Sequence, residues 1–336
     1  LRAQTGVGIN EDGSAPDPDA ILDLQSTSKG LLIPRMTTAQ REQIGAGVPA
    51  KGMMVYDTDT QSIWYFDGAL WVNTRLIALK DADDDTRIFV EKTPDEDVIR
   101  FEVAGQEVMH LDGKTLHLNA PGNSVFVGAG AGQNDNGIDD GIDNENTFIG
   151  AGAGFSTSSG IQNVFVGANA GAFNSSGLGN LFLGNNAGFN SNSANRNIFL
   201  GYSSGYSNTT GNNNYFSGYQ AGYQNVSGDN NLFAGYQAGY SSTEASGNQF
   251  VGYQAGYSTT SGYLNLFSGF KAGFANTTGH GNLFAGANSG LANTTGLENV
   301  FVGGNAGFSN ETGNHNYFSG YQAGYQNVSG DNNLFA

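Results

Sequence analysis

The sequence from about residue 122 onward repeats a unit of 17 residues. Twelve phenylalanines mark the period, because each lies 17 residues after the one before it. They are Phe148, Phe165, Phe182, Phe199, Phe216, Phe233, Phe250, Phe267, Phe284, Phe301, Phe318 and Phe335. Self-similarity at a fixed period is the signature of repeat proteins. Each repeat in such a protein stacks on its neighbours instead of folding around a core of its own.

Each unit has the same internal order. An Asn lies two positions before the Phe and a Gly two positions after it; Ala or Ser, Gly, and usually Phe or Tyr follow, before a polar stretch such as SNTTGN. An additional copy, SVFVGAGAG at 124–132, comes first, with five extra residues before the next Phe. Residues 214–234 recur without change as 316–336, six units later, so longer blocks of the chain also repeat.

This unit predicts one coil of a solenoid. It contains two short β-prone pieces, separated by Gly and closed by a turn rich in Asn, Thr and Gly. Stacked coils place equivalent residues in rows, and a row of Asn side chains can form an amide ladder. We therefore predict an all-β chain dominated by a parallel β-solenoid (β-roll) of 17-residue coils. The predicted ladder residues are Asn146, Asn163, Asn180, Asn197, Phe148, Phe165, Phe182 and Phe199.

The two faces of the predicted strands are both apolar. Phe165 points to one face, whereas Val164 and Val166 point to the other, because side chains alternate along a strand. One face can line the thin core of the coil, and the other needs a partner. We expect that partner to be another copy of the chain, so that the solenoids lie side by side.

The repeat region, roughly 122–336, resembles the head repeats of trimeric autotransporter adhesins. The resemblance rests on the in-register Asn and Phe followed by Gly, although the family's repeats are shorter than 17 residues. It implies a left-handed parallel β-roll with three rolls packed about an axis, and hence a homotrimer.

A change in charge near residue 145 separates this region from the first part of the chain. Residues 1–145 hold 11 Lys and Arg against 25 Asp and Glu, whereas residues 146–336 hold 2 against 5. The first part begins with a predicted small α+β module at 1–79, with a helix capped by Thr37 or Thr38 and three strands within 52–73. Its string LDLQSTSKGLLIPRMTTAQR resembles an N-terminal module of surface and tail-fibre-like proteins of Bacteroidetes.

A second module at 80–121 is predicted to form a β shaft or connector before the solenoid at 122–336. Its apolar and polar residues alternate in runs too short to build a core alone. The stretch from Asp97 to Met109, DVIRFEVAGQEVM, resembles the intertwined shaft segments of trimeric phage tail fibres. This second resemblance also implies a homotrimer.

An acidic insertion, NDNGIDDGIDNE at 134–145, separates the first two units. Its carboxylates offer the oxygen ligands that Ca²⁺ prefers, around two flexible glycines. The spacing does not follow the EF-hand, and a solvated acidic loop is the alternative. The candidate calcium ligands are Asp135, Asp139, Asp143 and Glu145, and calcium is the one cofactor that the sequence suggests.

Tyrosines also recur in rows. A row of exposed Tyr side chains could stack on sugar rings of a host glycan receptor, whereas a row that packs on itself would stabilise the coils. Both interpretations stay open. The candidate glycan-facing residues are Tyr202, Tyr219, Tyr236 and Tyr253.

Several classes of function are excluded or disfavoured. The net charge of −17 disfavours nucleic acid, Cys is absent, and no apolar run is long enough to span a membrane. FVGAGAG at 126–132 imitates a dinucleotide loop, but a further strand follows it instead of a helix. The four His residues are scattered without matched acids, and 146–336 has too few charges for a solenoid enzyme such as a polysaccharide lyase. We therefore expect no catalytic site.

These features predict an extracellular or cell-surface fibre. One interpretation is an adhesin or filament subunit, and the other is a receptor-binding tail fibre of a phage or contractile injection system. Leu1-Arg2-Ala3-Gln4 could be the remnant of a signal-peptide cleavage region, which would favour export. Ala336 falls just after a repeat Phe, so we expect the natural chain to continue with further units.

Overall fold

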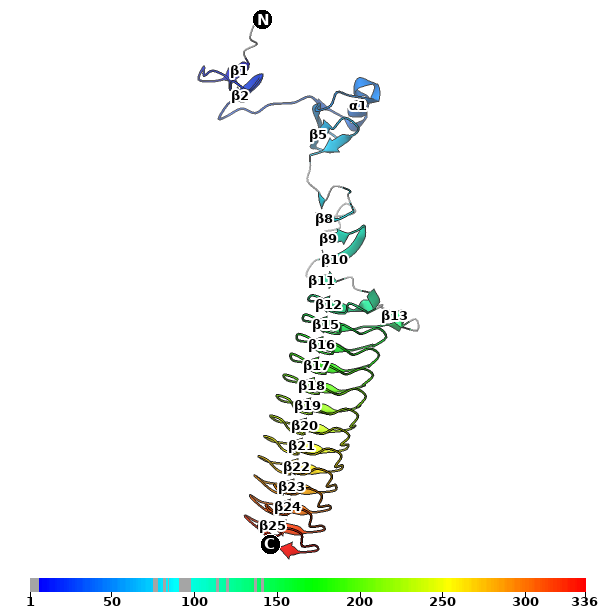
Figure 1. The fold of residues 1–336 in the computed structure, drawn as a ribbon. Coiled ribbons are helices and arrows are strands. Elements are labelled where there is room, and N and C mark those ends of the chain that lie inside the picture. Colours follow the sequence, from blue (N-terminus) through cyan, green and yellow to red (C-terminus); the bar gives the residue numbers. More distant parts are fainter. Residues whose placement is uncertain are drawn as a thin grey trace. The chain divides into compact units, whose positions relative to one another are not determined.

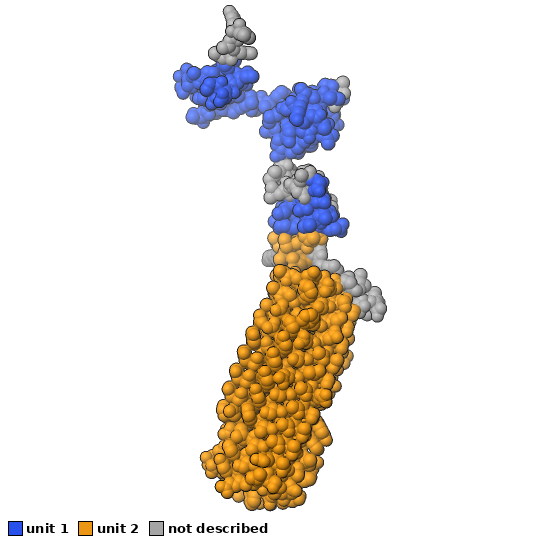
Figure 2. Space-filling view, in the orientation of Figure 1, with its two compact units in different colours: residues 1–106 blue, residues 107–336 orange. Residues whose placement is uncertain are grey.

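The structure is a computed structural model of the chain. It describes residues 6–74, 78–80, 83, 85–90, 98–112, 115–118, 121–135, 138–139 and 142–336. The chain divides into two compact units, residues 1–106 and 107–336, which Figure 2 colours blue and orange. Among the described residues, α1 (Thr38–Glu42) is the one α-helix, and nearly all other regular structure is strand. None of the helices in the described part of the chain has the length and apolar character needed to cross a membrane.

Thirteen short strands form one parallel sheet in unit 2, and Figure 1 shows them stacked along the solenoid. After the first pair, in which Phe126 lies beside Phe148, each strand pairs with the next in a 17-residue register, so Phe148 lies beside Phe165 and Phe165 beside Phe182. The prediction of a parallel β-solenoid is confirmed. The strands are β12 (Val125–Val127), β15 (Thr147–Ile149), β16 (Val164–Val166), β17 (Leu181–Leu183), β18 (Ile198–Leu200), β19 (Tyr215–Ser217), β20 (Leu232–Ala234), β21 (Gln249–Val251), β22 (Leu266–Ser268), β23 (Leu283–Ala285), β24 (Val300–Val302), β25 (Tyr317–Ser319) and β26 (Leu334–Phe335).

Each coil contains one strand, not the two β-prone pieces that the sequence predicts. After β16 the backbone enters the left-handed region at Asn169 (φ 55°) and Gly171 (φ 57°), and at Gly167 φ is also positive, at 136°. Three positive φ angles within five residues cannot continue an extended strand. The second piece of each unit is therefore a run of turns, and this expectation was wrong.

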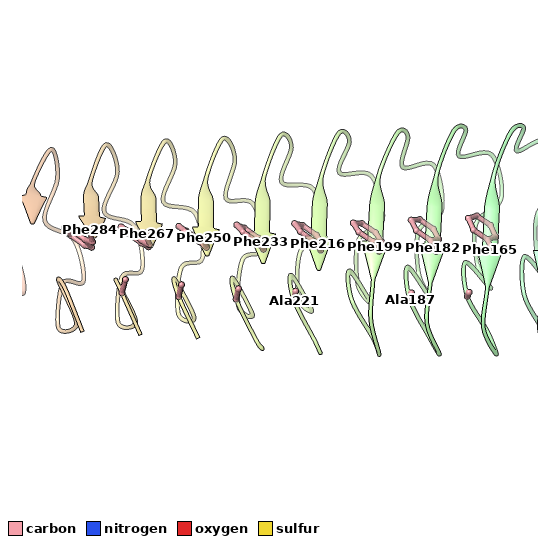
Figure 3. Close-up of a cluster of buried hydrophobic side chains, with 14 of the residues drawn as sticks. Phe165, Phe182, Ala187, Phe199, Phe216, Ala221, Phe233, Phe250, Phe267 and Phe284 are labelled. Atoms are coloured by element: carbon pink, nitrogen blue, oxygen red, sulfur yellow. The ribbon is translucent and has the colours of Figure 1, made fainter. Parts of the chain in front are cut away.

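The core of the solenoid is a single row of Phe rings. From Phe148 to Phe318 these side chains are fully buried, and neighbouring rings lie 4.7–4.9 Å apart within 7° of parallel. Figure 3 shows the rings pointing the same way from successive strands, with small Ala side chains beside them. The ring separation equals the ordinary spacing of paired strands, about 4.8 Å, so the stacking and the strand pairing reinforce each other.

The Gly six residues after each Phe is required by that ring. A Cβ at Gly171, for example, would lie 2.4 Å from the ring of Phe165. The coil is therefore thin because its own backbone closes directly over the Phe, which leaves room for little more than Ala.

The Asn two residues before each Phe forms the ladder that joins the coils. The side-chain oxygen of Asn146 accepts a hydrogen bond from the backbone N–H of Asn163 at 2.9 Å. The amide nitrogen of Asn163 donates to the carbonyl of Gly177 at 2.8 Å. The first contact recurs up to Asn333 and the second up to Asn316. A buried side chain must both accept and donate here, which Asn does and Asp does not.

Unit 1 and the start of unit 2 contain shorter sheets. Thr37 caps α1 in a capping box with Gln40, as the sequence predicts. The pairs are β1 with β2, β4 with β3 and β5, β5 with β6, β8 with β7 and β9, β10 with β11, and β13 with β14. The strands are β1 (Val7–Asn10), β2 (Leu22–Gln25), β3 (Arg35–Met36), β4 (Met54–Asp57), β5 (Ser62–Phe66), β6 (Trp71–Asn73), β7 (Ala78–Lys80), β8 (Arg87–Val90), β9 (Val98–Val103), β10 (Gln106–Asp112), β11 (Thr115–Leu118), β13 (Ile138–Asp139) and β14 (Ile142–Asp143).

Candidate functional site

A buried ion pair joins α1 to the sheet β3–β6 in unit 1. Arg41 from α1 donates from Nε to Oδ2 of Asp57 at the end of β4, at 2.9 Å, and both side chains are almost fully buried. The guanidinium carbon of Arg41 lies 3.9 Å from the ring centroid of Trp64. The hydroxyl group of Thr38 also donates to Asp57. Helix and sheet are therefore fixed to each other by one charged group on each element.

The surroundings of Asp57 keep it ionised. Burial alone would raise its pKa, but hydrogen bonds from Arg41, from the backbone of Thr60 and from Thr38 outweigh burial and lower the pKa to about 2. A buried pair of this kind becomes strongly destabilising when one partner is removed, because the other charge stays buried alone. Substitution of one partner should therefore destabilise this part of unit 1 selectively.

The predicted Tyr row lies on the surface of the solenoid. Tyr202, Tyr219, Tyr236 and Tyr253 are each between 42% and 48% exposed. Their rings stack face to face with centroids 5.0–5.3 Å apart. The row is thus both a stacking element and an open aromatic surface, and the geometry is compatible with either interpretation of the sequence.

A second Tyr row is less exposed. Tyr206, Tyr223, Tyr240 and Tyr257 stack at 5.0–5.2 Å, four residues further along each coil. Burial raises the pKa of Tyr223 and Tyr240, and the neighbouring tyrosines add to the effect. These phenols therefore resist ionisation.

The outer faces of the strands form an apolar stripe. The residues on either side of each core Phe point away from the core and remain partly exposed. Val164, Leu183, Val251 and Val302 are each 36–38% exposed. The stripe is mainly apolar along the parallel sheet and is interrupted by polar residues such as Ser217, Gln249 and Ser268.

The described carboxylates of the acidic insertion accept hydrogen bonds from amide side chains. Oδ1 and Oδ2 of Asp135 accept from Asn144 and Asn146 at 2.7 and 2.8 Å, and Asp143 accepts from Asn123. Glu145 contacts Gln162. The side chain of Asp139 and residues 136, 137, 140 and 141 lie outside the described residues. The calcium site stays a prediction.

The histidines of β10 and β11 are not scattered. His110 and His117 are paired across the hairpin and their rings stack at 4.2 Å, and each contacts a carboxylate. With Asp112 they are the one group of three or more His, Asp or Glu that the described residues bring close enough to hold a metal ion. The expectation that these histidines lack acids was wrong, because the hairpin register that joins them is not visible in the spacing.

A second polar row also escaped sequence analysis. It consists of the residue nine positions after each Phe, and its members are fully buried. Asn293 donates to Asn276 and Asn310 donates to Asn293, each at 2.9 Å. Asn276 and Asn293 begin N-x-Thr sequons, but both are buried, so their role is structural. The recurrence of Asn nine positions after the Phe in most units was the sequence signal for this row. The row is Thr157, Asn174, Ser191, Asn208, Asn225, Ser242, Thr259, Asn276, Asn293 and Asn310.

Comparison with known proteins identifies one region of the chain. Residues 8–85 match the family model described as a phage tail like trimerisation region. This stretch contains the Arg41–Asp57 pair. Searches of the curated proteins and of the solved structures each found no match. The match and the solenoid together fit a trimeric structural fibre of the phage tail-fibre kind.

Proposed function

We propose that the chain is the subunit of an extracellular, receptor-binding tail fibre of a phage or a contractile injection system. The observation that supports this most strongly is the match of residues 8–85 to a phage tail like trimerisation region, in one chain with a solenoid of 13 paired strands. The trimerisation region would hold three chains together, and the solenoid would supply a stiff rod. We propose a mechanical and binding role without catalysis.

The solenoid suits a load-transmitting rod. Every coil is joined to the next by backbone pairing, a ring stack and an Asn ladder, so bending would strain all three at once. Strand spacing of about 4.8 Å gives the 13 strands a length of about 55–60 Å. Only seven residues of 146–336 are charged, so few of its contacts depend on salt.

We further propose that the outer strand stripe packs between the three copies. Val164, Leu183, Val251 and Val302 lie on this stripe, and a trimerised chain offers the same stripe on each copy. Burial of apolar area contributes about 25 cal/mol per Å². The exposed Tyr row would then remain on the outside for a glycan receptor.

Light scattering after size exclusion tests the proposal. The full chain is expected to elute as a species of three times 35.1 kDa. Disruption of the Arg41–Asp57 pair by Asp57→Asn is expected to dissociate it, whereas the surface change Ser227→Ala is expected to leave it intact. A stable parent monomer would contradict the trimeric fibre.

A cell-surface adhesin is the second candidate, because the exposed Tyr row is equally suited to adhesion from a cell. The two differ in what the N-terminal region is attached to. Immunogold labelling of the producing cells and of particles released from them distinguishes these cases. Label on particles supports the tail fibre, and label confined to the cell envelope supports the adhesin.

A further inference from the structure

The hairpin β10–β11 brings together two imidazoles and a carboxylate on one face. His110 and His117 are direct cross-strand partners. Asp112 lies two residues after His110, so its side chain leaves the strand on the same face. One ligand atom from each of the three lies within 4.8 Å of the others. Strand alternation and register, not chance proximity of long side chains, therefore create the cluster.

The polar contacts orient the rings. Nδ1 of His110 lies 2.7 Å from Oε1 of Glu107, and Nε2 of His117 lies 3.0 Å from Oδ1 of Asp112. When the Glu107 carboxylate accepts the Nδ1 proton, Nε2 of His110 is the nitrogen that carries a free lone pair. A carboxylate behind a ligating imidazole is a common second shell in metal sites.

We propose that His110, His117 and Asp112 bind a divalent transition-metal ion such as Zn²⁺, with Glu107 as the orienting residue behind His110. Imidazole nitrogen and carboxylate oxygen suit Zn²⁺, whereas Ca²⁺ and Mg²⁺ prefer oxygen alone. Three protein ligands leave one position of a tetrahedral site for water. Because all the ligands come from one hairpin of one chain, the site does not depend on the proposed trimer.

The arrangement has a structural consequence for the hairpin. The two imidazoles come from opposite strands of the hairpin, so an ion bound to both would cross-link β10 and β11. The last ligand, His117, lies eight residues before β12 (Val125–Val127), the first strand of the solenoid.

Calorimetric titration of the full chain with Zn²⁺, purified without a histidine tag, tests the site. One Zn²⁺ per chain is expected. His110→Ala with His117→Ala is expected to abolish this binding, and Glu107→Gln is expected to weaken it by roughly 10–100-fold, as for other second-shell partners. X-ray absorption is expected to show two imidazoles at Zn–N distances of about 2.0–2.1 Å.

The chain supplies its own control. His280 and His315 lie in the solenoid, where His280 stacks on Tyr263 and His315 contacts Glu298. A variant with both changed to Ala loses the same number of imidazoles and is expected to bind Zn²⁺ like the parent. Binding that survives loss of His110 and His117, or that disappears with His280 and His315, overturns the proposal.

A milder variant distinguishes loss of a metal ligand from misfolding of the hairpin. His117→Gln keeps a polar side chain in β11 but supplies no imidazole, and it is expected to weaken Zn²⁺ binding at least tenfold while leaving the circular dichroism of the chain unchanged. Unchanged affinity in this variant also overturns the site.

Discussion

Asn225 and Ser242 occupy the same place in successive coils, and their buried atoms Oδ1 and Oγ both lack a hydrogen-bond partner among the described residues. The cause lies three residues further on. A Cβ at Gly228 would lie 2.4 Å from Oδ1 of Asn225, so Asn in this row requires Gly three residues later. Ser242 is followed by Ala245 instead. Where the row has Asn the partner is always Gly, and where it has Ser the partner is Ala.

This relationship predicts that the hydrogen bond missing between Asn225 and residue 242 can form only when residues 242 and 245 are changed together. In the double variant Ser242→Asn, Ala245→Gly, the new amide can donate to Asn225. A double-mutant cycle measured by thermal or denaturant unfolding is expected to give a favourable coupling of about 1–3 kcal/mol, the cost of a buried unsatisfied group. Ser242→Asn alone is expected to gain nothing, because its amide meets the Ala245 methyl group. Additive effects would contradict the pairing rule.

The Asn ladder predicts a strong difference between two adjacent asparagines. Asn231 is buried and donates from its amide to the carbonyl of Ala245 at 2.7 Å, whereas Asn230 is exposed. Asn231→Asp removes that donor and buries a carboxylate, so we expect the free energy of unfolding to fall by at least about 2 kcal/mol. Asn230→Asp is the matched control, with an expected change within about 0.5 kcal/mol. Equal effects would mean that the ladder does not stabilise the stack.

The second Tyr row predicts an alkaline limit to the solenoid. The pKa of Tyr223 and of Tyr240 is raised above the ordinary value of 10.0. The folded state therefore holds these protons more tightly than the unfolded chain does. Their contribution to stability is complete below pH 10 and is lost as the pH rises through the folded-state pKa.

Melting followed by circular dichroism between pH 8 and pH 12 is expected to show this loss. The variant Tyr223→Phe, Tyr240→Phe keeps the ring stack without the phenols, so its melting temperature should depend less on pH in that range. An unchanged slope would refute the assignment to these two residues.

The Arg41–Asp57 pair predicts acid sensitivity in the part of the chain that matches the trimerisation family model, residues 8–85. The pKa of Asp57 is lowered from 3.8 to about 2, so its contribution is present above pH 3.8 and is lost as the pH falls towards 2. Trp64 and Trp71 are the two tryptophans of the chain and both lie near Arg41, so Trp fluorescence reports on this region. We expect its unfolding between pH 4 and pH 2.

Asp57→Asn is the corresponding variant. It leaves Arg41 buried without its carboxylate partner, and we expect a loss of about 3–5 kcal/mol of stability at pH 7. Its Trp fluorescence should no longer show the parent's transition in that acid range. A parent-like acid transition in this variant would assign the transition to a different group.

The outer strand stripe predicts contacts between copies. The chain has no Cys, so a single Cys reports cleanly on proximity. Leu183→Cys, on the stripe, is expected to cross-link copies with a short bifunctional maleimide. Ser227→Cys, on an exposed turn, should remain uncross-linked. The opposite pattern would place the contact on another face.

The sequence predicts the solenoid well because every coil contains the same few strict requirements. A buried Phe, an amide that accepts and donates, and a Gly beneath the ring recur at fixed spacing, and their period alone defines the register. Thr37 and the three strands of 52–73 are also predictable, because capping and turn signals are local.

Other features depend on pairings that the sequence does not show. Arg41 and Asp57 are 16 residues apart and meet only when α1 packs on β4. His110 and His117 meet only once the register of the hairpin is fixed. The single strand per coil was missed because Asn169 adopts a left-handed conformation that its sequence merely permits.

Because strand pairing, the Phe stack and the Asn ladder recur from coil to coil, coils of the same sequence are interchangeable. Residues 214–234 and 316–336 are identical and 102 residues apart. Recombination between the two segments would remove or add six whole coils, about 29 Å of rod, and would leave every remaining Phe and Asn in register. The reach of the protein can therefore vary between descendants in discrete steps, without any change to the way that it folds.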